Sequence, residues 1–591
     1  MQFTGFHERT LFESADGFMV ALYTDPATNE TKKLVGYSLP DKRKVKYQFE
    51  ATEEDDAKYG GKKYNVTHFE IAPCGNKEEV IDLLSSGLFK GIGPATAKRI
   101  YEKYGDDAAR IVREEPERLI SIKGFSHKTI VKIKECNKAN ISETKVYELL
   151  SPYGFSIKQV HHICTRLYKT EPVSCIKAAP YVLCDIRGVT FDAVDAFANT
   201  LGVKKDSEDR IYAAAKEIIS QIMLRGHVAA RYEELSRELI KKLKTDLVDA
   251  SSVGKHILSL LKNERLSYRK VKDGEDIKFL IYLPYAKDAE DTLTSKLLKT
   301  VERKYSKKRN LDVLIHAEEM RTGIRLDQLQ TEAVKMALNN SLSIITGGPG
   351  TGKTTILKMV AKLWEELHPE MGIELLSPTG RAARRMTEST GYPASTIHSR
   401  LKLDIEEDRE VNENGRYPET IENSLVIIDE SSMLDLFLAR DLLVRLTDCS
   451  LLFVGDVDQL PSVGAGKVLS DMINSGQIPV TKLKYTHRQA EGSTICSNAD
   501  KVKNGVNSLS TSDEFRIYML PENNILSYDD ILTRMEDKMV SLYVEDAKKC
   551  GRKNVVVLCP YNKHPGGQIS MNIRLQRIFN PPDPSGGSLE Y

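Results

Sequence analysis

The sequence lacks the features that mark secreted proteins, membrane-spanning proteins and proteins with a structural metal site. Its nine cysteines are scattered, with no C-x-x-C pair and no metal-ligand spacing, a distribution typical of reduced thiols in the cytosol. No apolar run approaches the roughly 18 residues that a membrane-spanning helix needs. The polar, mixed N-terminus does not have the pattern of a signal peptide. We therefore expect a cytoplasmic protein with no membrane partner.

The sequence also lacks an excess of positive or negative charge. The 85 Lys and Arg residues against 84 Asp and Glu residues give a formal net charge of +1, so composition carries no global nucleic-acid signature. Any DNA track must come from local patches such as Arg381, Arg384 and Arg385. With 591 residues, 41% of them hydrophobic, the chain is long enough for several domains with cores of their own.

A glycine-rich segment follows a short apolar strand. Strand 342–346 leads into GGPGTGKTT at 347–355, and a run of helix formers follows, which is the context that a phosphate-binding loop requires. Glycines let backbone N–H groups surround a phosphate, and a helix N-terminus attracts negative charge. Lys353 can reach the β- and γ-phosphates, and the Thr354 hydroxyl can bind Mg²⁺. The predicted nucleoside triphosphate site consists of Gly347, Gly348, Pro349, Gly350, Thr351, Gly352, Lys353, Thr354 and Thr355.

Three later segments carry side chains suited to hydrolysis. Asp429 and Glu430 follow an apolar strand, where the first carboxylate suits Mg²⁺ and the second suits polarising the attacking water. Gln459 follows the strand 450–455 and can sense the γ-phosphate. Arg488 follows a strand near 480–485 and can stabilise charge on the transferred phosphoryl group. Taken alone, two acids at a strand end more often cap a helix, and a single arginine is usually a solvated surface residue.

The order of these motifs resembles that of superfamily 1 helicases, and specifically of the stand-alone RecD-like DNA helicases. Several matches in one order are more specific than any single pattern. Besides the phosphate loop, the resemblance rests on LDQLQTEAV (326–334), LLSPTGRAARRM (375–386), TIH (396–398), SLVIIDESSM (424–433), GDVDQLPSVGAG (455–466) and YTHRQAEGS (485–493).

The resemblance implies a cofactor pair, residue roles and a direction of movement. It implies ATP with Mg²⁺, an adenine contact from Gln330, and single-stranded DNA held by Pro378, Thr379, Arg381 and His398. It also implies ATP-driven 5′→3′ translocation, in DNA repair or recombination, on a strand with a 5′ end or overhang.

Three regions precede the motor-like segment. Residues 1–75 show short alternating segments separated by turns, which predicts a small antiparallel β-barrel. The corresponding family region resembles an OB-fold, and DNA binding and a scaffold role both stay open for it. Residues 76–215 have helical periodicity. Residues 216–320 show two helices and then a strand pair, a pattern typical of a winged-helix-like linker domain.

The helical region contains a degenerate repeat. Gly91-Ile92-Gly93 joins two short helices, with Lys98 close behind. Such glycines allow a tight turn and expose backbone N–H groups to a phosphate, so we expect a helix-hairpin-helix unit that grips DNA without reading sequence. Degraded copies follow at 120–133, 151–163 and 184–197. For these copies a helical spacer and a DNA contact both stay open.

Alternating strands and helices begin at residue 321. Strands near 342–346, 373–377, 425–429, 450–455 and 480–485 predict a parallel, RecA-like sheet in 321–495, with a polar insert at 402–423. The nucleotide should lie at the carboxyl ends of these strands. The predicted fold class is therefore multidomain α/β combined with all-α and small β parts.

The last segment, 496–591, departs from the motif pattern of the RecD-like family. A strand at 554–559 and a helix at 568–579 indicate the start of a second RecA-like domain, and the family's last motor motifs do not follow. We expect a truncated motor, with a single-strand-binding protein or a second chain completing it as candidate partners. Two functions therefore stay open: an ATP-dependent 5′→3′ DNA helicase, or a non-unwinding, ATP-binding DNA-binding module or half of a split motor.

Overall fold

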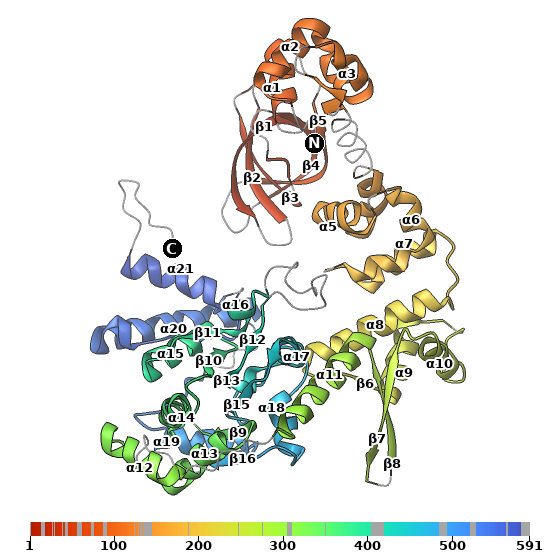
Figure 1. Ribbon diagram of the computed structural model, residues 1–591. Coiled ribbons are helices and arrows are strands. Elements are labelled where there is room, and N and C mark those ends of the chain that lie inside the picture. The colour runs from red at the N-terminus through yellow and green to blue at the C-terminus, as the bar shows by residue number, and fades with distance from the viewer. Residues whose placement is uncertain are drawn as a thin grey trace. The chain divides into compact units, whose positions relative to one another are not determined.

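The computed structural model describes most of the chain (Figure 1). The residues outside its description are 1, 14–17, 26–27, 29, 38, 42–44, 56–61, 73–75, 87–91, 123–124, 128, 131–132, 134–142, 144, 169, 187, 246, 275, 304–309, 349, 404–418, 484–492, 520–527, 563–564 and 581–591. The chain forms two compact units, Met1–Gly348 with Gly352–Lys484, and Pro349–Thr351 with Tyr485–Tyr591.

Five strands at the N-terminus close into a barrel in the order β1-β2-β3-β5-β4. Strand β1 pairs with β4 to close it, and the β3–β5 pair is parallel, unlike the all-antiparallel arrangement that we expected. Alternate side chains such as Tyr23 and Phe49 fill the interior. The strands are β1 (Gln2–Glu13), β2 (Phe18–Thr24), β3 (Thr31–Tyr37), β4 (Lys46–Asp55) and β5 (Lys62–Ile71).

Short helices follow the barrel. Helix-side residues Leu84, Ile100 and Ile111 share one apolar core with the barrel residues Leu34 and Phe49. The elements up to the middle of the chain are α1 (Lys77–Ser85), α2 (Pro94–Tyr104), η1 (Gly105–Asp107), α3 (Ala108–Glu114), η2 (Pro116–Ser121), η3 (Ser151–Tyr153), α5 (Ile157–His162), η4 (Ile163–Leu167), α6 (Pro172–Ala178), η5 (Pro180–Asp185) and α7 (Phe191–Thr200).

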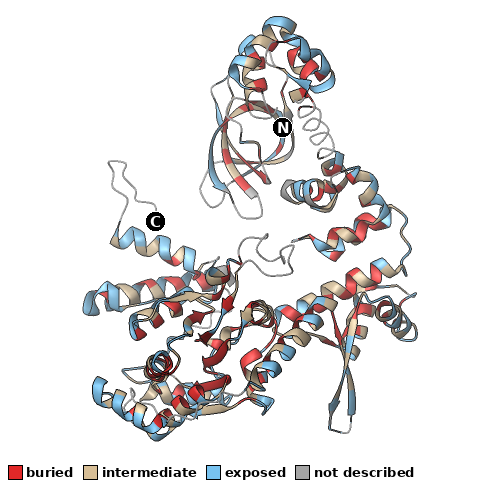
Figure 2. Ribbon diagram, in the orientation of Figure 1, coloured by how far each residue is buried: buried red, intermediate tan, exposed pale blue. Residues whose placement is uncertain are grey.

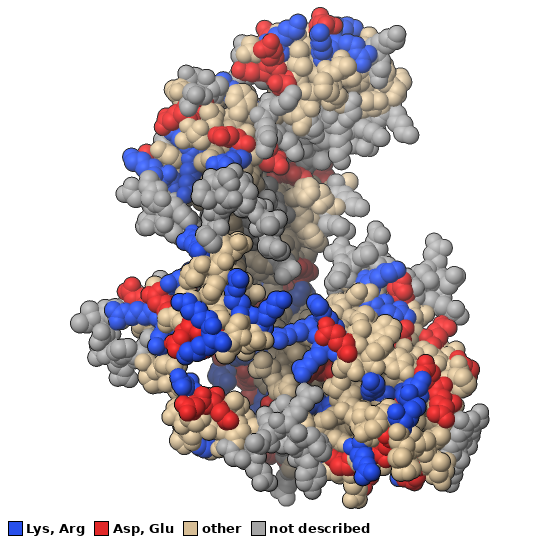
Figure 3. Space-filling view, turned by 90° about the vertical axis from the view of Figure 1, so that its left-hand side faces the viewer, with Lys and Arg blue, Asp and Glu red and all other residues tan. Residues whose placement is uncertain are grey.

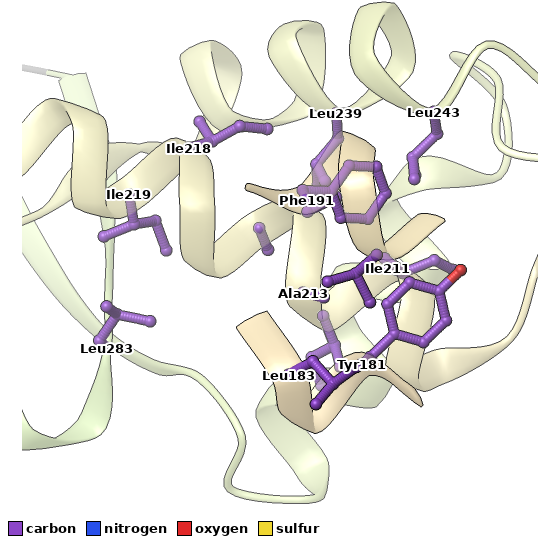
Figure 4. Close-up of a cluster of buried hydrophobic side chains, with 14 of the residues drawn as sticks. Tyr181, Leu183, Phe191, Ile211, Ala213, Ile218, Ile219, Leu239, Leu243 and Leu283 are labelled. Carbon is purple, nitrogen blue, oxygen red and sulfur yellow. The ribbon is translucent and has the colours of Figure 1, made fainter. Parts of the chain in front are cut away.

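A second core joins the later hairpins to the region that follows them. This core contains Tyr181, Phe191, Ile211, Leu239 and Leu283. In Figure 4 the Phe191 ring lies beside Leu239, and Leu283 lies farther along the core, near Ile219. Helix α8 (Glu208–Leu224) runs across the predicted domain boundary at 215/216. The other elements are β6 (Ala230–Arg231), α9 (Tyr232–Leu243), α10 (Val253–Lys262), β7 (Ser267–Asp273), β8 (Asp276–Tyr282), α11 (Pro284–Val301) and α12 (Leu311–Thr322), and the strands form a sheet in the order β6-β8-β7.

The predicted parallel sheet is confirmed, with six strands in the order β11-β10-β13-β15-β9-β16. Alternate residues of its strands enter two different cores, Ile344 and Phe453 on one face and Ile345 and Leu452 on the other, so both faces are covered. The strands are β9 (Leu342–Gly347), β10 (Gly372–Ser377), β11 (Ala394–Thr396), β13 (Ser424–Ile428), β15 (Ser450–Gly455) and β16 (Val480–Leu483). Figure 2 shows the central strands β13, β15 and β9 as buried.

Helices connect these strands, as a parallel sheet requires. They are α13 (Gln328–Asn339), α14 (Lys353–Leu367), α15 (Gly380–Thr390), α16 (Ile397–Leu401), η7 (Ser431–Met433), α17 (Leu436–Val444) and α18 (Val468–Asn474). A separate two-stranded sheet pairs β12 (Ile421–Glu422) with β14 (Leu446–Thr447). Most of the predicted insert 402–423 lies outside the described residues.

The regular secondary structure described in the second unit is helical, with α19 (Thr494–Lys503), α20 (Tyr528–Cys550), η8 (Arg552–Asn554) and α21 (Gln568–Phe579). The helix expected at 568–579 is confirmed, and the strand expected at 554–559 is wrong. Extended chain becomes a strand only by pairing, and the described part of this unit offers no neighbouring strand. As a result, Val556 and Leu558 are 65% and 82% exposed. None of the helices described in either unit combines the length and the apolar character that a membrane crossing requires.

Candidate nucleotide-binding site

The glycine-rich loop leaves the carboxyl end of β9 and enters α14, as its sequence predicts. Gly350 and Gly352 have φ angles of 80° and 86°, in the left-handed region that favours glycine. Gly352 starts α14 with no side-chain capping bond, which leaves the helix N-terminus open to an anion. The Lys353 Nζ donates to the carbonyl oxygens of Gly347 and Gly348 at 2.5 and 3.0 Å. A Cβ added to Gly348 would meet nothing within 4 Å, so a phosphate can approach this backbone.

The structure also describes the three threonines of the predicted loop. Thr351 is buried, and Thr354 and Thr355 occupy the first turn of α14. Pro349 lies outside the described residues. A hydroxyl one residue after the loop lysine fits the donor chemistry of Mg²⁺, which prefers oxygen ligands. The loop residues present therefore fit an Mg²⁺–nucleotide.

Two carboxylates lie at the end of strand β13, which is separated from β9 by β15. Asp429 N–H donates to the Leu376 carbonyl at 2.9 Å, which extends the β10–β13 pairing by one residue. Burial raises the pKa of both Asp429 and Glu430, and the Asp429 charge raises that of Glu430 further. The Lys353 ammonium opposes both shifts. The loop lysine and the two acids therefore act on one another at the carboxyl ends of β9 and β13, across the end of the intervening strand β15.

Glu430 has an unusual backbone. Its φ of 53° lies in the left-handed region, which is uncommon for a residue with a Cβ and costs of order 1 kcal/mol. The close approach of β15 accompanies this turn: a Cβ on Gly455 would lie 3.1 and 3.2 Å from the amides of Ser432 and Ser431. The packing holds the Glu430 backbone in this strained conformation beside Asp429. The sequence pattern gave no signal of that strain.

The loop after β15 carries Gln459. Gln459 Nε2 donates to Asp456 Oδ2 at 3.2 Å, and Asp456 is buried while Gln459 is exposed. The Asp456 charge also raises the pKa of Glu430. The far end of this loop is anchored, because Leu436 N–H donates to Ala465 and Gly466 N–H donates to Gly226. Sequence reasoning did not select Asp456 as a site residue, although its position directly after a buried strand was a usable signal.

Gln330 has a structural role in addition to its predicted one. It is buried, and with Asp327 it forms the capping box of α13: Asp327 Oδ1 accepts from Gln330 N–H at 2.8 Å, and Gln330 Oε1 accepts from Asp327 N–H at 3.1 Å. Its amide also packs against Gly352, so closely that a Cβ there would collide with it. Gln330 thus lies against the phosphate loop, and its adenine contact stays a prediction.

The predicted DNA segment lies at the same edge of the sheet. Strands β10 and β11 are parallel neighbours, so Pro378 and Thr379 follow one strand end while His398 follows the next. Thr379 caps α15, and Arg381 is exposed in its first turn. Arg384, in contrast, pairs with Glu388 at 3.0 Å, which weakens its part in a basic patch. Figure 3 likewise shows lysine and arginine among acidic side chains on the face that it displays.

The first hairpin differs from its later copies at the helix N-terminus. Gly93 starts α2 without a side-chain capping bond, and Lys98 is exposed on that helix. In the later copies, Ser156 and Thr190 accept the N3 amides of α5 and α7 at 3.3 Å. Gly91 and the predicted Arg488 both lie outside the described residues.

Comparisons with known proteins agree with this organisation. Residues 330–465 match the family described as "AAA domain", residues 139–229 match "ATP-dependent RecD2 DNA helicase HHH domain", and residues 81–138 match "SAM-like Helix-hairpin-helix tandem". The predicted helix-hairpin-helix region is thereby confirmed.

Curated relatives extend the similarity beyond single domains. The ATP-dependent RecD2 DNA helicase of Deinococcus radiodurans is 26% identical over 586 residues, covering 96% of this chain and 77% of that protein. The RecBCD subunit RecD of Mycolicibacterium smegmatis is 35% identical over 201 residues, 30% of this chain and 35% of that protein. A solved Pif1 helicase from Candida albicans aligns with 20% identity over 37% of this chain and 55% of that chain, and its TM-score of 0.25 supports no conclusion.

The fold and the site together define a P-loop ATPase joined to helix-hairpin-helix domains. Over nearly its whole length, the chain is homologous to the RecD-like ATP-dependent DNA helicases.

Proposed function

We propose that this protein is an ATP-dependent DNA helicase of the RecD-like type, which hydrolyses ATP to move 5′→3′ along single-stranded DNA. The observation that carries the proposal is the meeting of the phosphate loop with the Asp429–Glu430 pair at one edge of a parallel sheet. Homology over 96% of the chain supports the same activity. Repair or recombination is the setting that the resemblance favours.

Each side chain at the site has a proposed role. Loop amides and Lys353 bind the phosphates, and Thr354 and Asp429 hold Mg²⁺, directly or through its water shell. Bound Mg²⁺ would neutralise charge that develops on the phosphates. Glu430 polarises the attacking water, and its raised pKa marks a more basic carboxylate than an exposed glutamate. Gln459 senses the γ-phosphate.

Two further contacts complete the proposed ATP site. Arg488 stabilises charge on the transferred group, and Gln330 contacts the adenine. The close packing of the Gln330 amide on Gly352 supports a position beside the nucleotide.

The proposed DNA path uses two parts of the chain. Pro378, Thr379, Arg381 and His398 contact the translocating strand at the sheet edge, and the Gly91–Gly93 hairpin grips backbone phosphates. We also propose the domain division 1–75 (OB-like), 321–495 and 496–591. Between them, 76–215 and 216–320 (winged-helix-like) are two parts of the chain joined by helix α8 and one apolar core, and no domain boundary is proposed at 215/216. The closed barrel and the two helices followed by a β-hairpin support the two fold names.

The test is ATP hydrolysis by the full chain with and without single-stranded DNA. The parent should hydrolyse ATP faster when DNA is added. Glu430→Gln should still bind a fluorescent ATP analogue with Mg²⁺ and should not turn over, since an amide cannot polarise the water as a carboxylate does. Parental turnover by Glu430→Gln would refute the assignment, and an absence of DNA stimulation in the parent would refute the motor.

A further inference from the structure

Among the described residues, the β7–β8 hairpin pairs with another strand only near its base. Strand β6 pairs with β8 at Arg231–Leu280 and Ala230–Ile281, whereas β7 and β8 pair with each other as far as Asp273–Asp276. Figure 1 shows the two strands running together beyond α9, and Figure 2 shows their outer part as exposed or intermediate. Such a ribbon presents two faces, because side chains alternate along each strand.

One face of the ribbon packs on the protein. Arg269 forms an ion pair with Glu290 at 3.2 Å and another with Asp291, both on α11. Tyr282, on the same face by register, donates its hydroxyl to Glu290 at 3.1 Å. This face is therefore committed to internal contacts with α11.

The opposite face has a different composition. By register it carries the pairs Tyr268–Ile281, Lys270–Phe279 and Lys272–Ile277. Only Ile281, at the base, is buried; Tyr268, Phe279 and Ile277 are 53%, 40% and 48% exposed. The Tyr268 and Phe279 rings are neighbours, with centroids 6.2 Å apart.

The charge on this face has one sign. Lys270 and Lys272 are exposed, and neither forms an ion pair with any other described residue. The acidic Asp276 falls on the opposite face by register. Two adjacent aromatic rings flanked by unpaired cations match single-stranded nucleic acid, whose bases stack on rings while its phosphates meet cations. A protein partner would be expected to bring acidic groups to the lysines, and that alternative becomes an outcome of the test.

We propose that this face, defined by Tyr268, Lys270, Lys272, Ile277 and Phe279, binds single-stranded DNA. Bases stack on Tyr268 and Phe279, and Lys270 and Lys272 contact the phosphates. The proposal rests on the proposed function for its choice of DNA, and it adds a contact surface remote in sequence from both the hairpin glycines and the ATPase motifs.

The experiment measures binding of a fluorescein-labelled oligothymidylate to the full chain over a range of salt concentrations, without ATP. Replacing both rings, Tyr268→Leu with Phe279→Leu, keeps apolar bulk and removes stacking, and should weaken binding about tenfold at every salt concentration. Lys270→Ala with Lys272→Ala should make the slope of log affinity against log salt shallower by about 1.4, since single strands give about 0.7 per phosphate contact.

The matched control lies on the same ribbon. Val271→Ala changes the opposite face, and should leave both affinity and salt slope at the parental values. All variants should keep the parental melting curve, because the changed side chains are exposed or half-exposed. As a second measurement, ultraviolet crosslinking to an iodouracil strand followed by mass spectrometry should label Tyr268 or Phe279.

Parental affinity in both double variants, together with no crosslink on the ribbon, would overturn the proposal and leave the face to a protein partner. This failure is distinct from a failure of the proposed function. If the parent shows no DNA-stimulated ATP hydrolysis and the ring variant still loses DNA affinity, the proposed helicase activity is refuted. The proposed DNA-binding face of the β7–β8 hairpin is then supported.

Discussion

Gly93→Ser tests whether the first hairpin grips DNA by its helix N-terminus. Gly93 has φ −91° and ψ 173°, a conformation that serine adopts freely, and an added Cβ would meet nothing within 4 Å. A serine there would offer its hydroxyl oxygen to the first-turn amides of α2, as Ser156 and Thr190 already do in α5 and α7. Pro94 has no N–H, and the Thr96 amide donates to the Gly93 carbonyl at 3.0 Å, so the serine would compete for the amides of Ala95 and Thr96. Stability should stay within a few tenths of a kcal/mol of the parent.

DNA affinity should fall although the fold is unchanged. A hydrogen bond from an amide to a phosphate contributes about 1.5–3 kcal/mol, and a hydroxyl that competes for that amide removes part of it. Since about 1.4 kcal/mol is a tenfold change, we expect affinity to drop roughly tenfold. The drop should be equal for unrelated sequences, with a shallower salt slope, because the contact is to backbone phosphate.

The assay is fluorescence anisotropy with two unrelated DNA sequences, alongside ATP affinity, which should not change. The matched control is the reverse exchange, Thr190→Gly, in the fourth copy. There the Glu217 carboxylate already accepts the Phe191 amide at 2.8 Å, so an internal anion holds the place that a phosphate would take. Thr190→Gly should lower stability slightly and leave DNA affinity alone. Parental DNA affinity in Gly93→Ser would show that this hairpin is a spacer.

Two further predictions concern the ATP site and the second core. Lys353→Ala should abolish ATP hydrolysis without changing the melting temperature, because it removes the cation of the phosphate loop; residual turnover near the parental rate would refute that role. Asp195→Ala should lower the free energy of unfolding in urea by about 3–5 kcal/mol, since it leaves the buried Arg210 unpaired. Burial opposes ionisation of Asp195, yet bonds from Arg210 and Tyr181 hold its pKa below the usual range. The parent should thus have a larger free energy of unfolding than Asp195→Asn, and the difference should be greatest at neutral pH. It should shrink as pH falls through the lowered pKa of Asp195.

The α/β part of the fold was predictable because its strands are buried on both faces. Runs such as Ser424–Ile428 and Ser450–Gly455 are mostly apolar, and their order along the chain favours a parallel sheet with covering helices. Strand β1 carries no such signal: its outer half contains exposed Leu11 and Phe12, and bulges interrupt its pairing with β2. Local pattern therefore does not give the bounds of this strand.

The wrong strand at 554–559 shows the limit of local pattern. A run of valines favours extended chain, but a strand depends on a partner elsewhere in the fold, which local sequence does not report. The site shows the same limit. Motif spacing predicted that Lys353, Asp429 and Glu430 act together, whereas the strained backbone of Glu430 and the close packing of Gln330 on Gly352 depend on contacts that local sequence does not report.

Strand displacement by the purified chain tests the central claim most directly. The substrates are duplexes with a 5′ overhang, a 3′ overhang or blunt ends, each with ATP and Mg²⁺, and Glu430→Gln serves as the matched inactive control. The account predicts ATP-dependent displacement of the 5′-overhang duplex by the parent, no displacement of the other two, and none by Glu430→Gln. Displacement from the 3′ overhang alone would contradict the direction of movement. ATP hydrolysis without displacement of any duplex would contradict the helicase and favour the alternative of a truncated or split motor.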